Sequence, residues 1–296
     1  MISGSLIGQL IFDGLAIGLV FVILGCGLIT IVSIIKILFL AYGAFYTIGA
    51  YGTWYAMTYL NVNYWIGLLI GVIVSVIIGM VAFWLIFRTL KHKLGEKAFM
   101  STLIGSIGLQ ILLTQGGVLI YGNMSRSIPN VLPGVFHPFG MNITIAKLML
   151  IGISVGVALI LFWVYQKTAI GRSMRAVSYI PDAAALQGIS VDRVWLTAIG
   201  IACALAGIAG AILAPNYGMD PLMGSNVIWT VMLINQLGGM GSLLGAVFAG
   251  VIVGQALSWG MFFMGSLIQL VIFVGIMIVV YFRPFGLMGK DIALGV

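Results

Sequence analysis

The stretch of sequence that decides the fold is residues 221–282: PLMGSNVIWTVMLINQLGGMGSLLGAVFAGVIVGQALSWGMFFMGSLIQLVIFVGIMIVVYF. It contains 62 consecutive residues without a Lys, Arg, Asp or Glu. Charged side chains are costly at the centre of a lipid bilayer, and a helix needs about 20 apolar residues to cross the hydrocarbon core. The stretch is long enough for three membrane-spanning helices if two of them are short. It therefore predicts an integral membrane protein.

The composition of the whole chain leads to the same prediction. Charged residues make up 6% of the 296 residues, against about 25% in ordinary soluble proteins, and 62% of the residues are apolar. Thirteen basic and six acidic side chains cannot supply the polar shell of a soluble domain of this size. A soluble enzyme, a secreted disulfide scaffold and a nucleic-acid binder are thereby excluded, despite the net charge of +7. The 41 glycines suit helices that pack closely in lipid through small residues.

Further charge-free runs extend the pattern along the chain. They are 14–35, 37–87, 98–125, 148–166 and 194–219. The second of these is long enough for two helices, and each of the others holds one. Together with three helices in the deciding stretch, this predicts nine crossings, or roughly eight to nine membrane segments if a re-entrant half-helix replaces a full crossing. The expected fold is all-α: a polytopic integral membrane helical bundle in which residues 1–296 form a single transmembrane domain.

The basic residues set the expected orientation, because cytoplasmic loops carry an excess of Lys and Arg. Alternating crossings place 11 of the 13 basic residues on one side and leave only Arg126 and Lys147 on the other. The side with 11 should be cytoplasmic, so we expect the N-terminus and Asp13 outside and the C-terminus in the cytoplasm. The first basic residue is Lys36, so no basic region precedes the first apolar stretch. We expect that stretch to be retained as a span.

Two glycine-rich segments, 40–50 and 236–246, are expected to interrupt helices. Glycine in a helix interior costs about 1 kcal/mol relative to alanine. In the second segment Gly238, Gly239 and Gly241 fall within four residues. The sequence therefore predicts that the helices are interrupted, and we place the affected regions at about 37–60 and 226–258.

Both segments contain the pattern Gly-x5-Gly-Ala. Interrupted helices in two corresponding positions of a membrane protein indicate the binding region of a transporter. The alternative is close helix packing through small residues, which is the role that we expect for Gly250-xxx-Gly254. The candidate transport-pathway residues in the two segments are Gly43, Gly49, Gly239, Gly241 and Ser242.

The sequence contains no pattern that indicates catalysis or metal binding. The two histidines, His92 and His137, are 45 positions apart, and Cys26 and Cys203 lie in apolar stretches. The expected spans contain no acid pair and no nucleophile with a base. We therefore expect a protein that is not an enzyme, with no catalytic residue, no metal and no cofactor of its own. The scarcity of ionisable groups within the spans also disfavours a proton-coupled carrier.

The longest connection on the expected cytoplasmic side is 167–193. Pro181 suits the first position of a helix, Asp182 suits the positive end of its dipole, and Gly188 suits a left-handed C-cap. These residues predict a helix of about two turns, which is too short to be stable in water without a surface to pack on. It is either part of a tethered surface loop or a docking helix that transmits motion from a soluble partner.

Several motifs, in order, resemble ABC importer permeases of the branched-chain amino acid type. They are Ala41-x-Gly43-x-Phe45-Tyr46-x-x-Gly49-Ala50-Tyr51, Gly171-Arg172-x-x-Arg175-Ala176, Asp182-x-Ala184-Ala185-x-x-Gly188-Ile189, Ala204-Leu205-Ala206-Gly207-Ile208-Ala209-Gly210, Asp220-Pro221-x-x-Gly224, Leu237-Gly238-Gly239-Met240-Gly241-Ser242-x-x-Gly245-Ala246 and Arg283-Pro284-x-Gly286-Leu287. The resemblance covers most of the chain.

The resemblance implies a permease subunit in the inner membrane, which would translocate branched-chain amino acids or related small amino acids or amides. Its partners would be a second permease, homologous or identical, two ATPase subunits that bind the ATP, and an extracytoplasmic binding protein. The 167–193 connection would be the segment that couples the permease to the ATPase. The implied coupling residues are Gly171, Arg172, Arg175, Asp182, Ala184 and Gly188.

The chain departs from the family pattern near the expected pathway. The family commonly has histidine where this chain has Tyr42, which we add to the candidate pathway residues. The segment before the second glycine cluster often carries a basic residue, and residues 225–236 contain none. These departures concern the identity of the substrate. The alternative function is a self-sufficient secondary carrier for a small solute, which would transport when reconstituted alone under an ion gradient.

Overall fold

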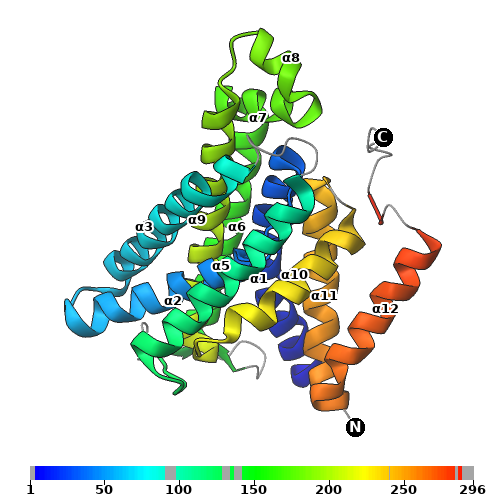
Figure 1. The fold of residues 1–296 in the computed structure, drawn as a ribbon. Coiled ribbons are helices and arrows are strands. Elements are labelled where there is room, and N and C mark those ends of the chain that lie inside the picture. The colour runs from blue at the N-terminus through cyan, green and yellow to red at the C-terminus, as the bar shows by residue number, and fades with distance from the viewer. Residues whose placement is uncertain are drawn as a thin grey trace.

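The computed structural model describes residues 4–90, 98–128, 134–136, 142–239, 241–283 and 286–288. They form a helical bundle (Figure 1), and two very short antiparallel strands pair beside it. The described elements are α1 (Gly4–Ile35), α2 (Tyr42–Tyr59), α3 (Tyr64–Ala82), the π-helix η1 (Phe83–Phe87), α5 (Ala98–Tyr121), β1 (Val135–Phe136), β2 (Ile143–Thr144), α6 (Ile145–Lys167), α7 (Ala169–Tyr179), α8 (Pro181–Leu186), α9 (Val191–Tyr217), α10 (Met223–Gly238), α11 (Leu243–Met264), the 3-10 helix η4 (Gly265–Leu267) and α12 (Ile268–Phe282).

The charge-free runs contain the helices predicted for them. The run 37–87 holds α2 and α3, and the run 221–282 holds α10, α11 and α12. In the described part of the chain, six segments are long and apolar enough to cross a membrane: Leu6–Ile35, Tyr64–Leu90, Met100–Tyr121, Ile145–Lys167, Val191–Tyr217 and Leu243–Phe282. The last of these segments contains both α11 and α12. The all-α membrane bundle is confirmed, whereas the number of full crossings stays a prediction.

Glycine allows α1 and α11 to pack with their backbones in contact. Gly18 of α1 faces Gly250 and Gly254 of α11, and a Cβ on Gly254 would overlap the backbone of Gly18. At the end of this contact the Ser258 hydroxyl donates a hydrogen bond to the Leu10 carbonyl at 2.7 Å. The packing role predicted for Gly250-xxx-Gly254 is confirmed.

A second close contact joins α2, α3 and α9. A Cβ on Gly49 of α2 would overlap the backbone of Gly207 in α9. Ser75 of α3 donates hydrogen bonds to the carbonyls of Phe45 in α2, at 3.2 Å, and Cys203 in α9, at 2.9 Å. α3 and α9 therefore hold the N-terminal half of α2 in a fixed place against the rest of the bundle.

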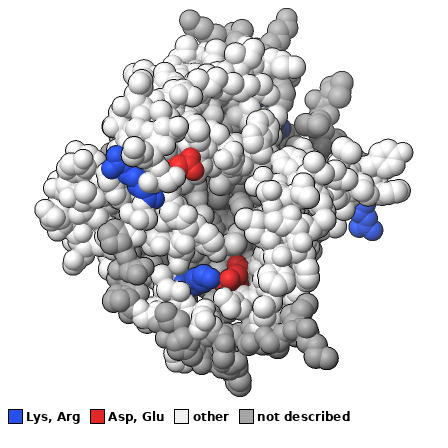
Figure 2. Space-filling model, turned by 90° about the horizontal axis from the view of Figure 1, so that it is seen from below, with Lys and Arg blue, Asp and Glu red and all other residues white. Residues whose placement is uncertain are grey.

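The two ends of the bundle differ in what they carry. The short helices α7 and α8 lie at the upper end of the bundle in Figure 1, and the start of α1 lies at the lower end. The lower face is mostly uncharged, and most of its basic groups lie beside acidic ones (Figure 2). One such pair joins Lys147 of α6 to Asp13 of α1 at 2.7 Å. The segregation of the basic residues between the two ends stays a prediction.

The first helix interruption lies earlier than predicted. Helix α2 is continuous from Tyr42 to Tyr59 and contains both Gly43 and Gly49. The non-helical connection is instead 36–41, which begins at Lys36 with a φ of 57°. Of the segment 40–50 that was expected to interrupt a helix, only residues 40 and 41 do so, and they lie within the predicted region of about 37–60; residues 42–50 are helical. The reason is that these glycines bring α2 close to α9 and α10 rather than interrupting its own hydrogen bonds.

Candidate functional site

The second glycine segment interrupts the helix at the position that the sequence predicted. Helix α10 ends at Gly238, and Gly239 and Gly241 have φ values of 98° and 95°, in the region that favours glycine. Ser242 then caps α11, because its hydroxyl accepts a hydrogen bond from the Gly245 amide at 3.1 Å. Ser242 thus has a structural role at the start of the next helix.

The end of α10 is fixed on two sides. A Cβ on Gly238 would overlap the backbone of Gly245, so the chain turns back tightly into α11. On the other side, the amides of Leu287 and Met288 donate to the carbonyls of Leu237 and Gly238, at 2.8 and 3.2 Å. The last carbonyls of a helix have no partner within it, and here a segment from beyond α12 satisfies two of them.

The first candidate segment is packed deep in the bundle. Tyr42 is 1% exposed and lies against Gly27 of α1, and its hydroxyl has no hydrogen-bond partner among the described residues. Gly43 lies directly against Gly224 of α10. The Gly224 amide also donates to the Thr47 hydroxyl at 3.1 Å. The start of α2 and the start of α10 are therefore joined.

The structure brings the two candidate segments to the same part of α1. Gly25 of α1 lies next to Asn235, in the last turn of α10. Two residues further along α1, Gly27 lies next to Tyr42. α1 therefore contacts both candidate segments within one helical turn.

A polar stripe on α5 belongs to this region, and the sequence analysis missed it. Its members recur every four residues and lie on one side of the helix: Thr102, Ser106, Gln110 and Thr114. Ser106 and Thr102 are 0% exposed and Thr114 is 8% exposed. The four-residue spacing is visible in the sequence, but these side chains carry no charge. They therefore do not interrupt the charge-free run 98–125 from which the span was predicted.

The stripe holds the connection between α1 and α2. The Ser106 hydroxyl donates to the Leu38 carbonyl at 3.1 Å and accepts from the Leu40 amide at 3.4 Å. The Gln110 carboxamide accepts from the Ala44 amide at 3.2 Å and donates to the Ser225 hydroxyl of α10 at 3.1 Å. Buried backbone groups of a non-helical segment need such partners in lipid. α5 therefore stabilises the first interruption and ties it to α10.

The predicted helix of the 167–193 connection is present as α8. Pro181 is its first residue, and Gly188, just beyond it, has a φ of 83°. Ala184 is 4% exposed, so it faces the bundle and anchors α8 there. Its amide donates to the Ile180 carbonyl at 3.1 Å, which is the first hydrogen bond of the helix.

The structure adds a second helix, α7, which the sequence analysis did not predict. The Thr168 hydroxyl caps it by accepting from the Gly171 amide at 3.2 Å. Gly171 and Arg175 both pack on the end of α6: a Cβ on Gly171 would overlap the Tyr165 carbonyl, and Arg175 donates a hydrogen bond to that same carbonyl. These two predicted coupling residues thus fix the joint between α6 and α7 instead of facing outward.

The outward face of α7 and α8 combines apolar and charged side chains. Tyr179, Ile180 and Leu186 are 80%, 60% and 90% exposed, and Arg172 and Asp182 are exposed as well. We call these five residues the docking surface. The two charged members were predicted from the sequence, whereas the three apolar ones were not, because single apolar residues in a loop form no pattern. Apolar side chains grouped on a polar end of a protein indicate an interaction site.

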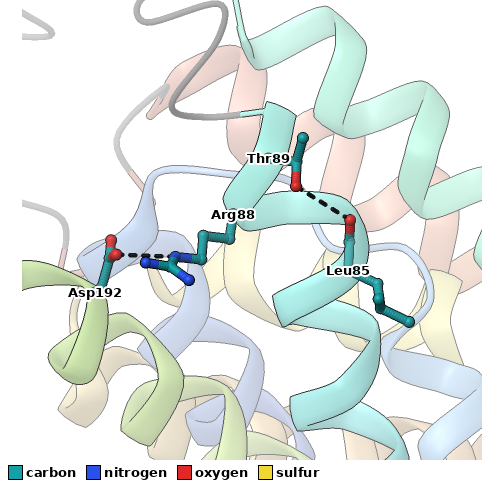
Figure 3. A network of polar contacts seen from close by, with 4 residues as sticks. All are labelled: Leu85, Arg88, Thr89 and Asp192. Atoms are coloured by element: carbon teal, nitrogen blue, oxygen red, sulfur yellow. Dashed lines mark hydrogen bonds and ion pairs between the residues drawn. The ribbon is translucent and has the colours of Figure 1, made fainter.

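An ion pair holds the neighbouring helix ends together. Arg88, directly after η1, lies 3.0 Å from the carboxylate of Asp192 in the first turn of α9 (Figure 3). On the same turn the Thr89 hydroxyl donates to the Leu85 carbonyl at 3.3 Å. The Arg88 and Asp192 side chains are 44% and 34% exposed. Pairs this exposed contribute about 0–1 kcal/mol, so the contact serves chiefly to position the start of α9.

In the described part of the chain, no group of three or more His, Cys, Asp or Glu side chains could hold a metal ion. The polar groups that the structure gathers are hydroxyls, carboxamides and backbone atoms. Such groups can bind a small polar solute.

The comparisons with known proteins cover nearly the whole chain. The family model described as branched-chain amino acid transport system / permease component matches residues 10–281. The high-affinity branched-chain amino acid transport system permease protein BraD of Pseudomonas aeruginosa is 28% identical over 300 residues, which cover 95% of each chain. The corresponding protein LivH of Escherichia coli (strain K12) is 26% identical over 295 residues, again 95% of each chain.

A comparison of structures gives a weaker likeness. A chain of the solved structure titled PsaBC from Streptococcus pneumoniae in complex with Fab has a TM-score of 0.47 and 14% sequence identity to this chain. The alignment covers 93% of this chain and 91% of that one. At this TM-score the likeness carries no conclusion about function.

Proposed function

Because the chain belongs to the family of branched-chain amino acid transport system permease components, we propose that it is the transmembrane permease subunit of a binding-protein-dependent ABC importer. The observation that carries this proposal is the family match over residues 10–281. Branched-chain amino acids, or related small amino acids and amides, are the proposed substrates. The full-length similarity to BraD and LivH favours this function over a self-sufficient secondary carrier.

The proposed complex contains three further kinds of subunit. A second permease, related or identical, completes the membrane part, two ATPase subunits bind and hydrolyse ATP, and an extracytoplasmic binding protein delivers the substrate. The docking surface on α7 and α8 is the proposed contact with the ATPase. Its support is the 90% exposure of Leu186 in α8, which lies at the opposite end of the bundle from the start of α1.

Reconstitution tests the proposed function directly. In proteoliposomes, uptake of labelled leucine should require the ATPase subunits, the binding protein and ATP together. The same vesicles with the permease alone, under a Na⁺ or H⁺ gradient, are the control and should take up nothing above background. Gradient-driven uptake by the permease alone would support the secondary carrier and contradict the importer.

The proposed orientation in the inner membrane, with the N-terminus outside and the C-terminus in the cytoplasm, can be tested by cysteine labelling. Single cysteines at exposed positions on the two ends of the bundle should behave oppositely towards an impermeant thiol reagent. We expect Ser127→Cys to label in sealed cells, and Thr89→Cys and Gln187→Cys only after the membrane is opened.

The parent chain supplies the control for this experiment, because Cys26 and Cys203 are both buried and should not label. Labelling of Gln187→Cys from outside would place the docking surface on the wrong side of the membrane for an ATPase. That result would contradict both the orientation and the proposed coupling contact.

A further inference from the structure

One buried polar side chain in the bundle has no partner that explains it. Asn235, in the last turn of α10, is 6% exposed, and neither its amide nitrogen nor its oxygen makes a hydrogen bond to any described residue. Burying a carboxamide in this way is unfavourable, and an apolar side chain of similar shape would remove the cost. A group retained against that cost in a buried position calls for an explanation outside packing.

The surroundings of Asn235 suggest what the explanation is. Asn235 lines a small cavity of about 20 Å³, together with Gln236 and with apolar side chains of α1, α10 and the connection before α2. On the α1 side, the amide oxygen lies opposite Gly25, where a Cβ would come within 3.3 Å of it. The cavity therefore pairs two carboxamides with an apolar wall, in a place where glycine leaves room beside the amide.

The position of the cavity connects it to the interruption of the helix. Asn235 and Gln236 lie within one turn of Gly239, and the Gly239 amide donates to the Asn235 carbonyl at 3.0 Å. The carbonyls of Leu237 and Gly238, further along, are already bonded to Leu287 and Met288. The Asn235 carboxamide is therefore a buried polar group without a hydrogen bond at the end of α10, and it lines the cavity.

We propose that Asn235, assisted by Gln236, is a substrate contact in the permeation pathway, and this inference rests on the proposed function. The ligand class is a zwitterionic α-amino acid with an aliphatic side chain. A carboxamide offers both a donor and an acceptor, so it can bind a carboxylate and an ammonium group. Because it is neutral, it binds neither charge tightly, which suits a site that a solute must leave as readily as it enters. The apolar wall receives the aliphatic side chain.

The size of the cavity defines the conformation that the structure represents. A volume of about 20 Å³ holds about one water molecule and is much too small for an amino acid. α10 must therefore move away from α1 before a substrate can reach Asn235. The break at Gly239 and Gly241 makes α10 and α11 separate helices, so α10 can tilt about its fixed end while α11 keeps its glycine contact with α1. The described conformation is closed at this point of the pathway.

Asn235→Leu tests the inference, because the two explanations of the residue predict opposite results. The variant is measured in the complete reconstituted transporter by initial uptake of labelled leucine per complex, substrate-stimulated ATP hydrolysis and the Tm of the complex. We expect uptake to fall at least about tenfold, ATP hydrolysis to stay within about twofold of the parent, and Tm to be unchanged or higher, since an unpaired carboxamide has been removed. Leu233→Met, on α10 but outside the cavity lining, is the matched control and should keep uptake within about twofold.

Three outcomes would overturn the inference. Normal uptake by Asn235→Leu would show that no substrate contact has been lost. A fall in uptake matched by a fall in Tm would show that the residue is structural. Loss of stimulated ATP hydrolysis at unchanged Tm would assign Asn235 to coupling. Failure of the proposed function looks different: the parent complex itself would then take up no amino acid, whereas the inference about Asn235 is judged by the ratio of variant to parent.

Discussion

Replacement of Ala184 by proline is expected to abolish both uptake and substrate-stimulated ATP hydrolysis in the reconstituted complex. The Ala184 amide makes the first hydrogen bond of α8, to the Ile180 carbonyl at 3.1 Å, and proline has no hydrogen to donate. In a helix of six residues, one lost bond and one clash leave too little to hold the docking surface in shape. Ala184 lies outside the membrane-spanning helices, so the amount of protein in the membrane should be unaffected.

The neighbouring residue offers a matched control. Ala183 is exposed, and its amide falls in the first turn, where helix amides lack an intrahelical partner. Ala183→Pro should therefore keep most of the activity. Leu186→Glu tests the docking surface itself and leaves the helical conformation of α8 intact. It should weaken copurification of the ATPase subunits. Asn123→Glu, at the other end of the bundle, should not. Normal stimulated hydrolysis in the Ala184→Pro complex would mean that α8 is not the coupling element.

The second large effect is expected at the break between α10 and α11. Gly239→Val and Gly241→Val place a β-branched residue at φ values of 98° and 95°, which costs of the order of 1–3 kcal/mol and changes how α10 ends. If this break lets α10 move, uptake per complex should fall at least about tenfold. Uptake of labelled leucine, divided by the amount of complex in the vesicles, measures the effect.

Variants at two other glycines are controls. They distinguish the effects of backbone strain and of helix packing from an effect on transport. Gly265 has a φ of 57° with open space around it, at the turn after α11, so Gly265→Val brings similar strain away from the pathway. Gly250 packs directly on Val22 of α1, so Gly250→Val should lower the amount of complex. Neither change should lower uptake per complex by more than about twofold. Equal losses per complex in all four variants would remove the support for a moving break.

The sequence predicted those features that leave a mark in composition. The charge-free runs predicted the helices, because a charge in the bilayer is too costly to be placed by chance. The break at Gly238, Gly239 and Gly241 was predictable because three glycines so close together are unfavourable in any helix. Pro181 and Gly188 marked the ends of α8 correctly for the same kind of reason, since each residue suits one backbone position.

The features that could not be predicted from the sequence depend on which neighbouring helix a residue contacts. Gly43 and Gly49 look like helix breakers, yet they pack α2 against Gly224 and Gly207, and only the neighbouring helix decides between the two roles. The family resemblance implied Arg175 as a coupling residue, and only the structure shows that it bonds to the end of α6. Asn235 was an unremarked polar residue in an apolar run, and its significance comes from a missing partner that only a structure can show.

The glycine contact between α1 and α11 has a consequence for how the protein is made. Its partners are far apart in the chain: the Ser258–Leu10 hydrogen bond spans 248 positions. α1 leaves the ribosome first and enters the membrane long before α11 is synthesised. The face of α1 that carries Gly18 therefore contacts lipid until the helices between them have been inserted. Contacts of such high sequence separation form late and slowly. The contact between α1 and α11 therefore forms only when synthesis is nearly complete. In a chain truncated before α11, the face of α1 that carries Gly18 would stay without its partner helix.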